Sequence, residues 1–414
     1  METFRVSSIL FYSGRIQHMT KNYALHITHY VLTHSIILSA GLLAVILASC
    51  APAPVPVDPA IAVTQAFETA LAQINQPTAT AVITETPVPT PTVPRTPPAL
   101  PATYISNILN PLDTPYTYVT DSCQYLKDKW NPNNSAPGTI VIVIMFHGIN
   151  KDSSSLDNND ISVQGFNKLM KDLKELGFEA INATQLADFL DSNARIPQRS
   201  VVLIYDDRKF AEAFEHFRPY HEQWGWPVIN GWISAFGGQD NVLAENVALE
   251  QEGWVDHQAH GFIHNVNITP YSTDEYIYGE LQGSIDNIQK YFGKTPIAYI
   301  WPGGGFTPRG VQVAREVGYR VGFTVNSRGP IMFNWVPLAD AFDPGHPDAI
   351  PEGPSNDPRL TLPRYWPMQV LAQLDTIRVM GNDASAYAEQ NKAVELEYYD
   401  IVCSPTLGPI PPAQ

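Results

Sequence analysis

Two pairs of residues in this sequence have the types and the spacing needed to activate water on a metal ion. Asp206 and Asp207 directly follow an apolar run at 201–205, and His260 and His264 lie further along the chain at i and i+4. Two histidines and one carboxylate are enough to hold a divalent metal with one position left open for water. The other carboxylate of the acidic pair would then lie beside that water as its base. Together the two pairs predict a metal-dependent hydrolase.

Each pair also has a purely structural explanation. Adjacent aspartates commonly cap a helix N-terminus, and two histidines are commonly ordinary polar residues of the surface or the core. Histidines at i and i+4 would lie on the same side of a helical turn, close enough to share one ion. Because each pair follows a predicted strand, we favour the metal site over these alternatives.

The elements that would position these side chains alternate between apolar β-type runs and helical segments. We expect strands at 139–146, 200–205, 227–233, 254–258, 297–301 and 320–325, and helices at 162–176, 209–217, 240–251, 273–292 and 308–317. Such alternation indicates parallel βαβ units, which gather their chemistry at the C-terminal ends of the strands. The Pro-, Gly- and Asp-rich stretch 329–363 is predicted to be a long loop.

The motifs and their order resemble the polysaccharide deacetylase (NodB-like) family. VVLIYDDR at 201–208 resembles the first family motif, T-F-D-D-G, and QAHGFIH at 258–264 resembles the second, H-[S/T]-x-x-H. IAYIWPGGGF at 297–306 resembles the third motif region in the form found in extracellular poly-N-acetylglucosamine deacetylases. TIVIVIMFHGI and LTLPRYW resemble the opening strand and the closing segment of that subgroup, so the resemblance covers about residues 138–366.

The resemblance implies an α/β fold, a distorted (β/α) barrel of the NodB-like deacetylase type. It implies a hydrolase that removes N-acetyl or O-acetyl groups from an acetylated polysaccharide. Asp207, His260 and His264 would bind the metal, which we expect to be Zn²⁺, and Asp206 would be the general base. The same resemblance marks a set of candidate substrate-binding residues: Trp301, Pro302, Gly303, Gly304, His147, Arg208 and Arg364.

The chain departs from the family pattern at several positions. Arg208 and Gly261 stand where the family has Gly and Ser/Thr, and Ile300 stands where many members have an arginine that orients the catalytic aspartate. Arg208 or Arg364 would have to replace that arginine. The C-terminal Leu-x-His motif that supplies the proton for the leaving amine is missing, which leaves His147 and His346 as candidates. A glycan-binding module of the same fold with little turnover, or an amidase acting on a small amide, are the alternatives.

The N-terminal part of the chain has the composition of an export signal and a stalk. The uncharged apolar stretch 35–49 follows a basic region and ends in Leu-Ala-Ser-Cys, which resembles the lipobox of bacterial lipoproteins. We therefore predict a signal at 1–50 with lipidated Cys50, rather than a transmembrane anchor or a buried helix. The segment 51–115 is rich in Pro and Thr and is predicted to be a disordered linker. The catalytic domain would span 116–405, followed by a tail at 406–414.

The remaining cysteines and the net charge bear on location and partners. Cys123 and Cys403 lie near opposite ends of the predicted domain, and in an oxidising compartment they would pair; two unrelated buried thiols are the alternative. The net charge of −16 and the lack of a basic cluster argue against nucleic acid as a partner. We expect a monomer outside the cytoplasm, held at the membrane by its lipid anchor.

Overall fold

The structure is a computed structural model. It describes residues 95–106, 113–115, 119–150, 159–235, 240–264, 266–325, 332–333, 336–340, 355 and 357–413. The predicted signal at 1–50, with Cys50, and the linker up to residue 94 lie outside the described residues. Within the described part, no helix is both long and apolar enough to cross a membrane.

A parallel sheet forms the centre of the folded unit. Its strands run in the order β10-β9-β8-β7-β6-β2, with β5 also paired to β6, and every pairing in it is parallel. This order is the one expected from successive βαβ units. The strands of the sheet are β2 (Ile140–Phe146), β5 (Glu179–Ala180), β6 (Arg199–Asp206), β7 (Val228–Trp232), β8 (Val255–Ala259), β9 (Ala298–Ile300) and β10 (Val321–Phe323).

A short extended segment near the C-terminus joins the two edges of this sheet. Leu362 forms a parallel bridge with Phe323 of β10, and Tyr365 forms another with Ile144 of β2. The segment therefore occupies the place of an eighth strand and lets the sheet curl towards a closed barrel. The predicted α/β fold with a distorted barrel is confirmed.

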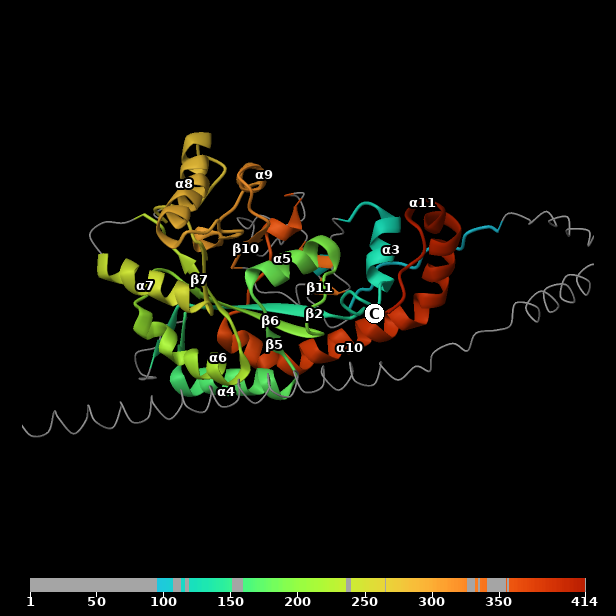
Figure 1. Cartoon of the computed structure of the whole chain (residues 1–414), viewed down its shortest axis with the longest axis horizontal. Helices are drawn as coiled ribbons and strands as arrows, with labels where there is room; N and C mark the ends of the chain where they lie inside the picture. The colour runs from blue at the N-terminus through green and yellow to red at the C-terminus, as the bar shows by residue number, and fades with distance from the viewer. Residues whose placement is uncertain are drawn as a thin grey trace, which may run out of the picture. The chain divides into compact units, whose positions relative to one another are not determined.

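Alternate residues of β2 face opposite sides of the sheet. Ile142 and Ile144 belong to an apolar cluster with helices α4 (Val163–Glu175) and α10 (Pro367–Tyr398). Val141 and Val143 belong to a second cluster with α5 (Ala183–Ser192). Figure 1 shows α4 and α10 on one side of β2 and β6, and α5 on the other. Because β2 is buried on both faces, its sequence is a continuous apolar run.

The other elements surround this core. The helices along the barrel are η2 (Ala211–His216), α6 (Arg218–Trp224), α7 (Asp240–Glu252), α8 (Asp274–Phe292), η3 (Pro302–Gly304), α9 (Pro308–Glu316) and η5 (Pro358–Leu360). Two small sheets lie outside the barrel, formed by β3 (Gly148–Asn150) with β4 (Asp160–Ser162), and by β1 (Asp113–Pro115), β12 (Val336–Asp340) and β11 (Met332–Phe333). The helices at the C-terminal end are η6 (Tyr399–Cys403) and α11 (Ser404–Leu407), which lie near α3 (Ser122–Trp130).

Both ends of the described chain pack against this helical end of the unit. A disulfide joins Cys123 of α3 to Cys403 of η6. The Tyr387 hydroxyl of α10 donates to the carbonyl of Ala102 at 2.9 Å, and the Asn133 side chain donates to the carbonyl of Pro412, in the predicted tail, at 3.2 Å. The folded unit thus extends to the N-terminal side of the predicted boundary at residue 116.

Three local expectations differ from the structure. The segment 209–217 was predicted to be one helix, but it contains only the short 3-10 helix η2, and a separate α-helix, α6, begins at Arg218. The predicted long loop at 329–363 contains strands β11 and β12, and β1 pairs with β12. The helical turn expected for the two histidines is absent: residues 260–264 form an irregular loop.

Candidate active site

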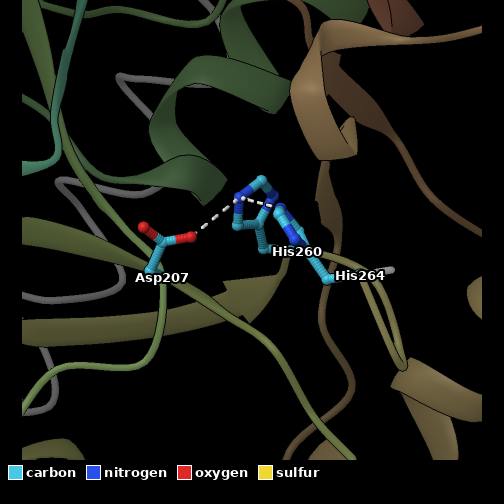
Figure 2. A group of neighbouring side chains, drawn as sticks. All are labelled: Asp207, His260 and His264. Atoms are coloured by element: carbon cyan, nitrogen blue, oxygen red, sulfur yellow. Dashed lines mark hydrogen bonds and ion pairs between the residues drawn. The ribbon is translucent and has the colours of Figure 1, made fainter. Parts of the chain in front are cut away.

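Three side chains converge beyond the C-terminal ends of β6 and β8. Asp207 follows β6, and His260 and His264 belong to the loop that follows β8. One ligand atom from each of the three lies within 4.8 Å of the other two. Figure 2 shows the two imidazoles edge to face with the carboxylate beside them; His260 Nε2 is 3.1 Å from His264 Nε2 and 3.7 Å from Asp207 Oδ1. The three residues thus form a compact set of two nitrogen donors and one oxygen donor.

The donor set fits a divalent metal such as Zn²⁺. Two imidazoles and one carboxylate are a usual ligand set for catalytic zinc, which keeps further positions open. His260 Nδ1 donates to the carbonyl of Ile300 at 2.9 Å, which leaves the Nε2 lone pair free to bind an ion. Burial lowers the pKa of His260 to about 4, so the imidazole is neutral at neutral pH, as a metal ligand must be.

Asp206, the other aspartate of the pair, has a different environment from Asp207. Asp206 is fully buried, and Nη1 of Arg364 lies 2.8 Å from both of its carboxylate oxygens. Burial by itself would raise the pKa of Asp206, but Arg364 above all, with His260 and His147, holds it below its usual value. Asp206 is therefore an ionised carboxylate beside the metal-ligand set, as a general base requires.

His147 also lies close to the Asp206 carboxylate. Its Nε2 is 3.5 Å from Asp206 Oδ2, and its ring lies 5.1 Å from that of Trp366. The side chain is 26% exposed, which leaves it accessible to a substrate. Burial lowers the pKa of His147, while Asp206 acts in the opposite direction. Of the two histidines predicted as proton donors, His147 is at the site and His346 is outside the described residues.

Residues 194–322 match the family model for polysaccharide deacetylase. This stretch of the chain is therefore similar to a polysaccharide deacetylase domain. Its structure is similar to that of the deacetylase PplD from Streptococcus pyogenes in complex with acetate, at 19% identity over 57% of this chain and 98% of that one, with a TM-score of 0.45. No curated protein sequence matches the chain.

Two further solved structures are similar to the deacetylase domain. A polysaccharide deacetylase from Bacillus cereus is 17% identical over 56% of this chain and 68% of that one, with a TM-score of 0.42. IcaB from Ammonifex degensii is 15% identical over 58% of this chain and 98% of that one, with a TM-score of 0.45.

The two arginines that the sequence left as alternatives, Arg208 and Arg364, have different partners in the structure. Arg364 reaches Asp206 from the segment that closes the barrel, and only 1% of its side chain is exposed. Arg208 instead donates hydrogen bonds to the carbonyls of Ile233 and Ala235, in the loop after β7. Arg364 is therefore the arginine that orients Asp206, which is one of the two roles predicted for it, and Arg208 holds a neighbouring loop.

The predicted substrate-binding group around Trp301 is only partly accessible. The Trp301 side chain is fully buried, and its Nε1 donates to the carbonyl of Leu360 at 2.7 Å, so the structure gives it a packing role in place of the predicted substrate contact. Pro302 is buried as well. Gly303 is exposed and Gly304 is half-buried, so within this group the accessible surface comes from the glycine backbone.

Asn230 of β7 is a site residue that the sequence reasoning missed. Its Nδ2 donates to the carbonyls of Tyr205 at 2.9 Å and Asp207 at 3.1 Å. Asp207 has a φ of 69°, a left-handed conformation that costs energy for a residue other than glycine. Asn230 stabilises this turn and so directs the Asp207 carboxylate towards the histidines. Its only sequence signal is a polar residue inside the apolar strand VINGW.

Proposed function

We propose that this protein is a metal-dependent hydrolase that removes N-acetyl, or O-acetyl, groups from a cell-surface or extracellular polysaccharide. The observation that carries the proposal is the cluster of Asp207, His260 and His264 beside the buried pair of Asp206 and Arg364. A deacetylase needs a metal site, a base and an acid in one place, and this part of the domain offers a candidate for each.

Asp207, His260 and His264 would hold the ion, for which we propose Zn²⁺. When bound, such an ion polarises the acetyl carbonyl and makes water a good nucleophile near neutral pH. Asp206 takes the proton from the attacking water, because its carboxylate is ionised and lies next to the ligand set. Arg364 fixes the direction of that carboxylate and balances its charge in the protein interior.

His147 is the proposed general acid. Cleavage of an amide C–N bond requires a proton on the leaving nitrogen, and His147 Nε2 is the partly exposed donor closest to the Asp206 carboxylate among the described histidines outside the ligand set. The carboxylate that accepts a proton from water is therefore in contact with the imidazole that gives one to the amine. An ester substrate has a better leaving group and depends less on this donor.

We also propose that the protein acts outside the cytoplasm as a lipoprotein anchored through Cys50. The disulfide between Cys123 and Cys403 supports an oxidising compartment, where such bonds persist. The export-type sequence at 1–50 would supply the signal and the anchor. The Pro-rich segment after it would act as an extended spacer between the membrane and the catalytic domain.

The test is acetate release from acetylated glucosamine oligomers. We expect release by the zinc-loaded protein, loss of release with a chelator, recovery on adding Zn²⁺, and a fall of roughly 10²–10⁴-fold in kcat for Asp206→Asn. Asp375→Asn, an exposed aspartate on α10, is the matched control and should keep full activity. If the zinc-loaded protein releases no acetate from any acetylated glycan, the proposal fails and a glycan-binding module of the same fold becomes the better explanation.

A further inference from the structure

The loop that carries the two metal-ligand histidines is held through its backbone on two sides. On one side its carbonyls accept hydrogen bonds from the amides after β7: Ser234 N lies 3.2 Å from Gly261 O, and Ala235 N lies 2.7 Å from Phe262 O. On the other side its amides point towards helix α8. The backbone path of this loop, rather than a helical turn, therefore decides where the second imidazole lies.

Glu280 of α8 receives those amides. Its Oε2 accepts from Phe262 N at 2.9 Å and from His264 N at 3.4 Å, and its Oε1 accepts from Ile263 N at 3.0 Å. Consecutive amides around one carboxylate form an anion-binding nest. Glu280 is only 2% exposed, and no lysine or arginine in the described part of the chain forms an ion pair with it. The Glu280 carboxylate therefore binds the backbone amides of this loop and, in the described part of the chain, no cationic side chain.

The loop needs such support because its backbone is strained. His264 has a φ of 65°, in the left-handed region that residues with a Cβ avoid. Strained conformations persist only where the surroundings determine them from several directions. The three amides bound by Glu280 are those of His264 and of the two residues before it, so the carboxylate acts on the turn that sets the direction of the His264 ring.

Gly261 leaves room for the Glu280 carboxylate beside the loop. A Cβ at Gly261 would lie 2.9 Å from Glu280 Oε2 and 2.9 Å from Pro302 Cγ, and the φ of 81° would be strained for any other residue. The departure at position 261, where the family motif has Ser or Thr, therefore leaves the space that the Glu280 carboxylate uses.

We propose that Glu280 is a positioning residue for the metal centre: it fixes the loop so that His264 Nε2 faces His260 and Asp207. This inference rests on the proposed metal site. Outer partners of metal ligands typically change metal affinity by about 10–100-fold when they are removed.

The experiment measures zinc affinity by competition with a chromophoric chelator, on the wild type and on Glu280→Ala, Glu280→Gln and Glu275→Ala. Glu275 is an exposed acid in the first turn of the same helix and is the matched control. We expect binding about 10–100-fold weaker for Glu280→Ala, a smaller loss for Glu280→Gln, which keeps one acceptor, and no change for Glu275→Ala. In the metal-free state, the amides of residues 262–264 should exchange with solvent faster in both Glu280 variants than in the wild type.

The outcomes separate this inference from the proposed function. If wild type and Glu280→Ala, both folded by circular dichroism, bind zinc equally tightly and protect these amides equally, Glu280 has no positioning role although the metal site stands. If the wild type itself binds no divalent ion, the proposed metal site fails and the inference fails with it. If Glu280→Ala does not fold, Glu280→Gln decides through the same two measurements.

Discussion

Nη1 of Arg364 lies 2.8 Å from both carboxylate oxygens of Asp206, although the two residues are 158 positions apart in the chain. Both side chains are 1% exposed, so the pair is completed only when the segment around Arg364 closes the barrel between β10 and β2. Closure of the fold and ionisation of the proposed base are thereby linked.

We expect Arg364→Met to destabilise the protein and to raise the pKa of the base. Breaking a buried pair on one side leaves an uncompensated charge, which costs about 3–5 kcal/mol of the free energy of unfolding. Arg364 lowers the pKa of Asp206, so its loss should move the acidic limb of the kcat/KM profile to higher pH. Denaturant unfolding and a pH profile check the two effects.

The double variant Asp206→Asn/Arg364→Met is the control for this prediction. It removes both charges, so it should recover part of the lost stability but none of the activity. An acidic limb that stays at the same pH in Arg364→Met would contradict the assignment of Asp206 as the titrating base.

We expect His147→Phe to affect amide substrates more than esters. Loss of a general acid typically costs about 10²–10⁴-fold in kcat, but an activated acetate ester has a leaving group that needs no proton. Acetate release from glucosamine oligomers and hydrolysis of a nitrophenyl acetate should therefore fall by very different factors, with zinc content unchanged. Equal losses on both substrates would show that His147 is not the acid.

The pH dependence of this step has a definite sign. The acid must be protonated, so activity should fall as pH rises through the pKa of His147. Burial lowers this pKa, so the alkaline limb on amide substrates should lie below the range of an ordinary histidine. Profiles of wild type and His147→Phe, measured on the ester, should show no such limb.

The sequence predicts the residues that do chemistry better than the residues that hold them. Asp207, His260 and His264 belong to motifs whose order along the chain is readable. The strand before Asp207, β6, is a continuous apolar run because the sheet is buried on both faces. Glu280 lies in the middle of a predicted helix and Asn230 inside a strand. Their function depends on backbone amides and carbonyls of loops with positive φ, which residue patterns do not encode.

Helix α10 was missed for a related reason. Its buried face includes small residues such as Gly381, Ala384 and Ala388, which let it pack closely under β2. Small residues weaken the contrast between an apolar and a polar face, which is the main signal of an amphipathic helix. Cys403 follows this helix. The sequence therefore predicted that Cys123 and Cys403 pair, but not which helix brings Cys403 to Cys123.

We expect the disulfide between Cys123 and Cys403 to contribute strongly to stability. Closing a loop of this length lowers the entropy of the unfolded chain, which corresponds to about 5 kcal/mol in the chain-entropy model. Cys123→Ala/Cys403→Ala should unfold at a clearly lower denaturant concentration than the wild type under non-reducing conditions, and equally with it under reducing conditions. Because the disulfide joins α3 and η6, neither of which carries a metal-ligand residue, zinc affinity at low temperature should stay unchanged; a loss would show that the two regions are coupled.

Asn230→Ala should weaken the metal site through Asp207. The substitution removes the two hydrogen bonds that hold the left-handed turn at Asp207, and buried acceptors without donors cost roughly 1–3 kcal/mol of stability. Freed from this turn, Asp207 should bind the ion less well, by about 10-fold as for other outer partners of metal ligands. Asn391→Ala on α10 removes one amide donor to a carbonyl of its own helix and is the matched control. Unchanged zinc affinity in a folded Asn230→Ala protein would mean that Asp207 keeps its direction without Asn230.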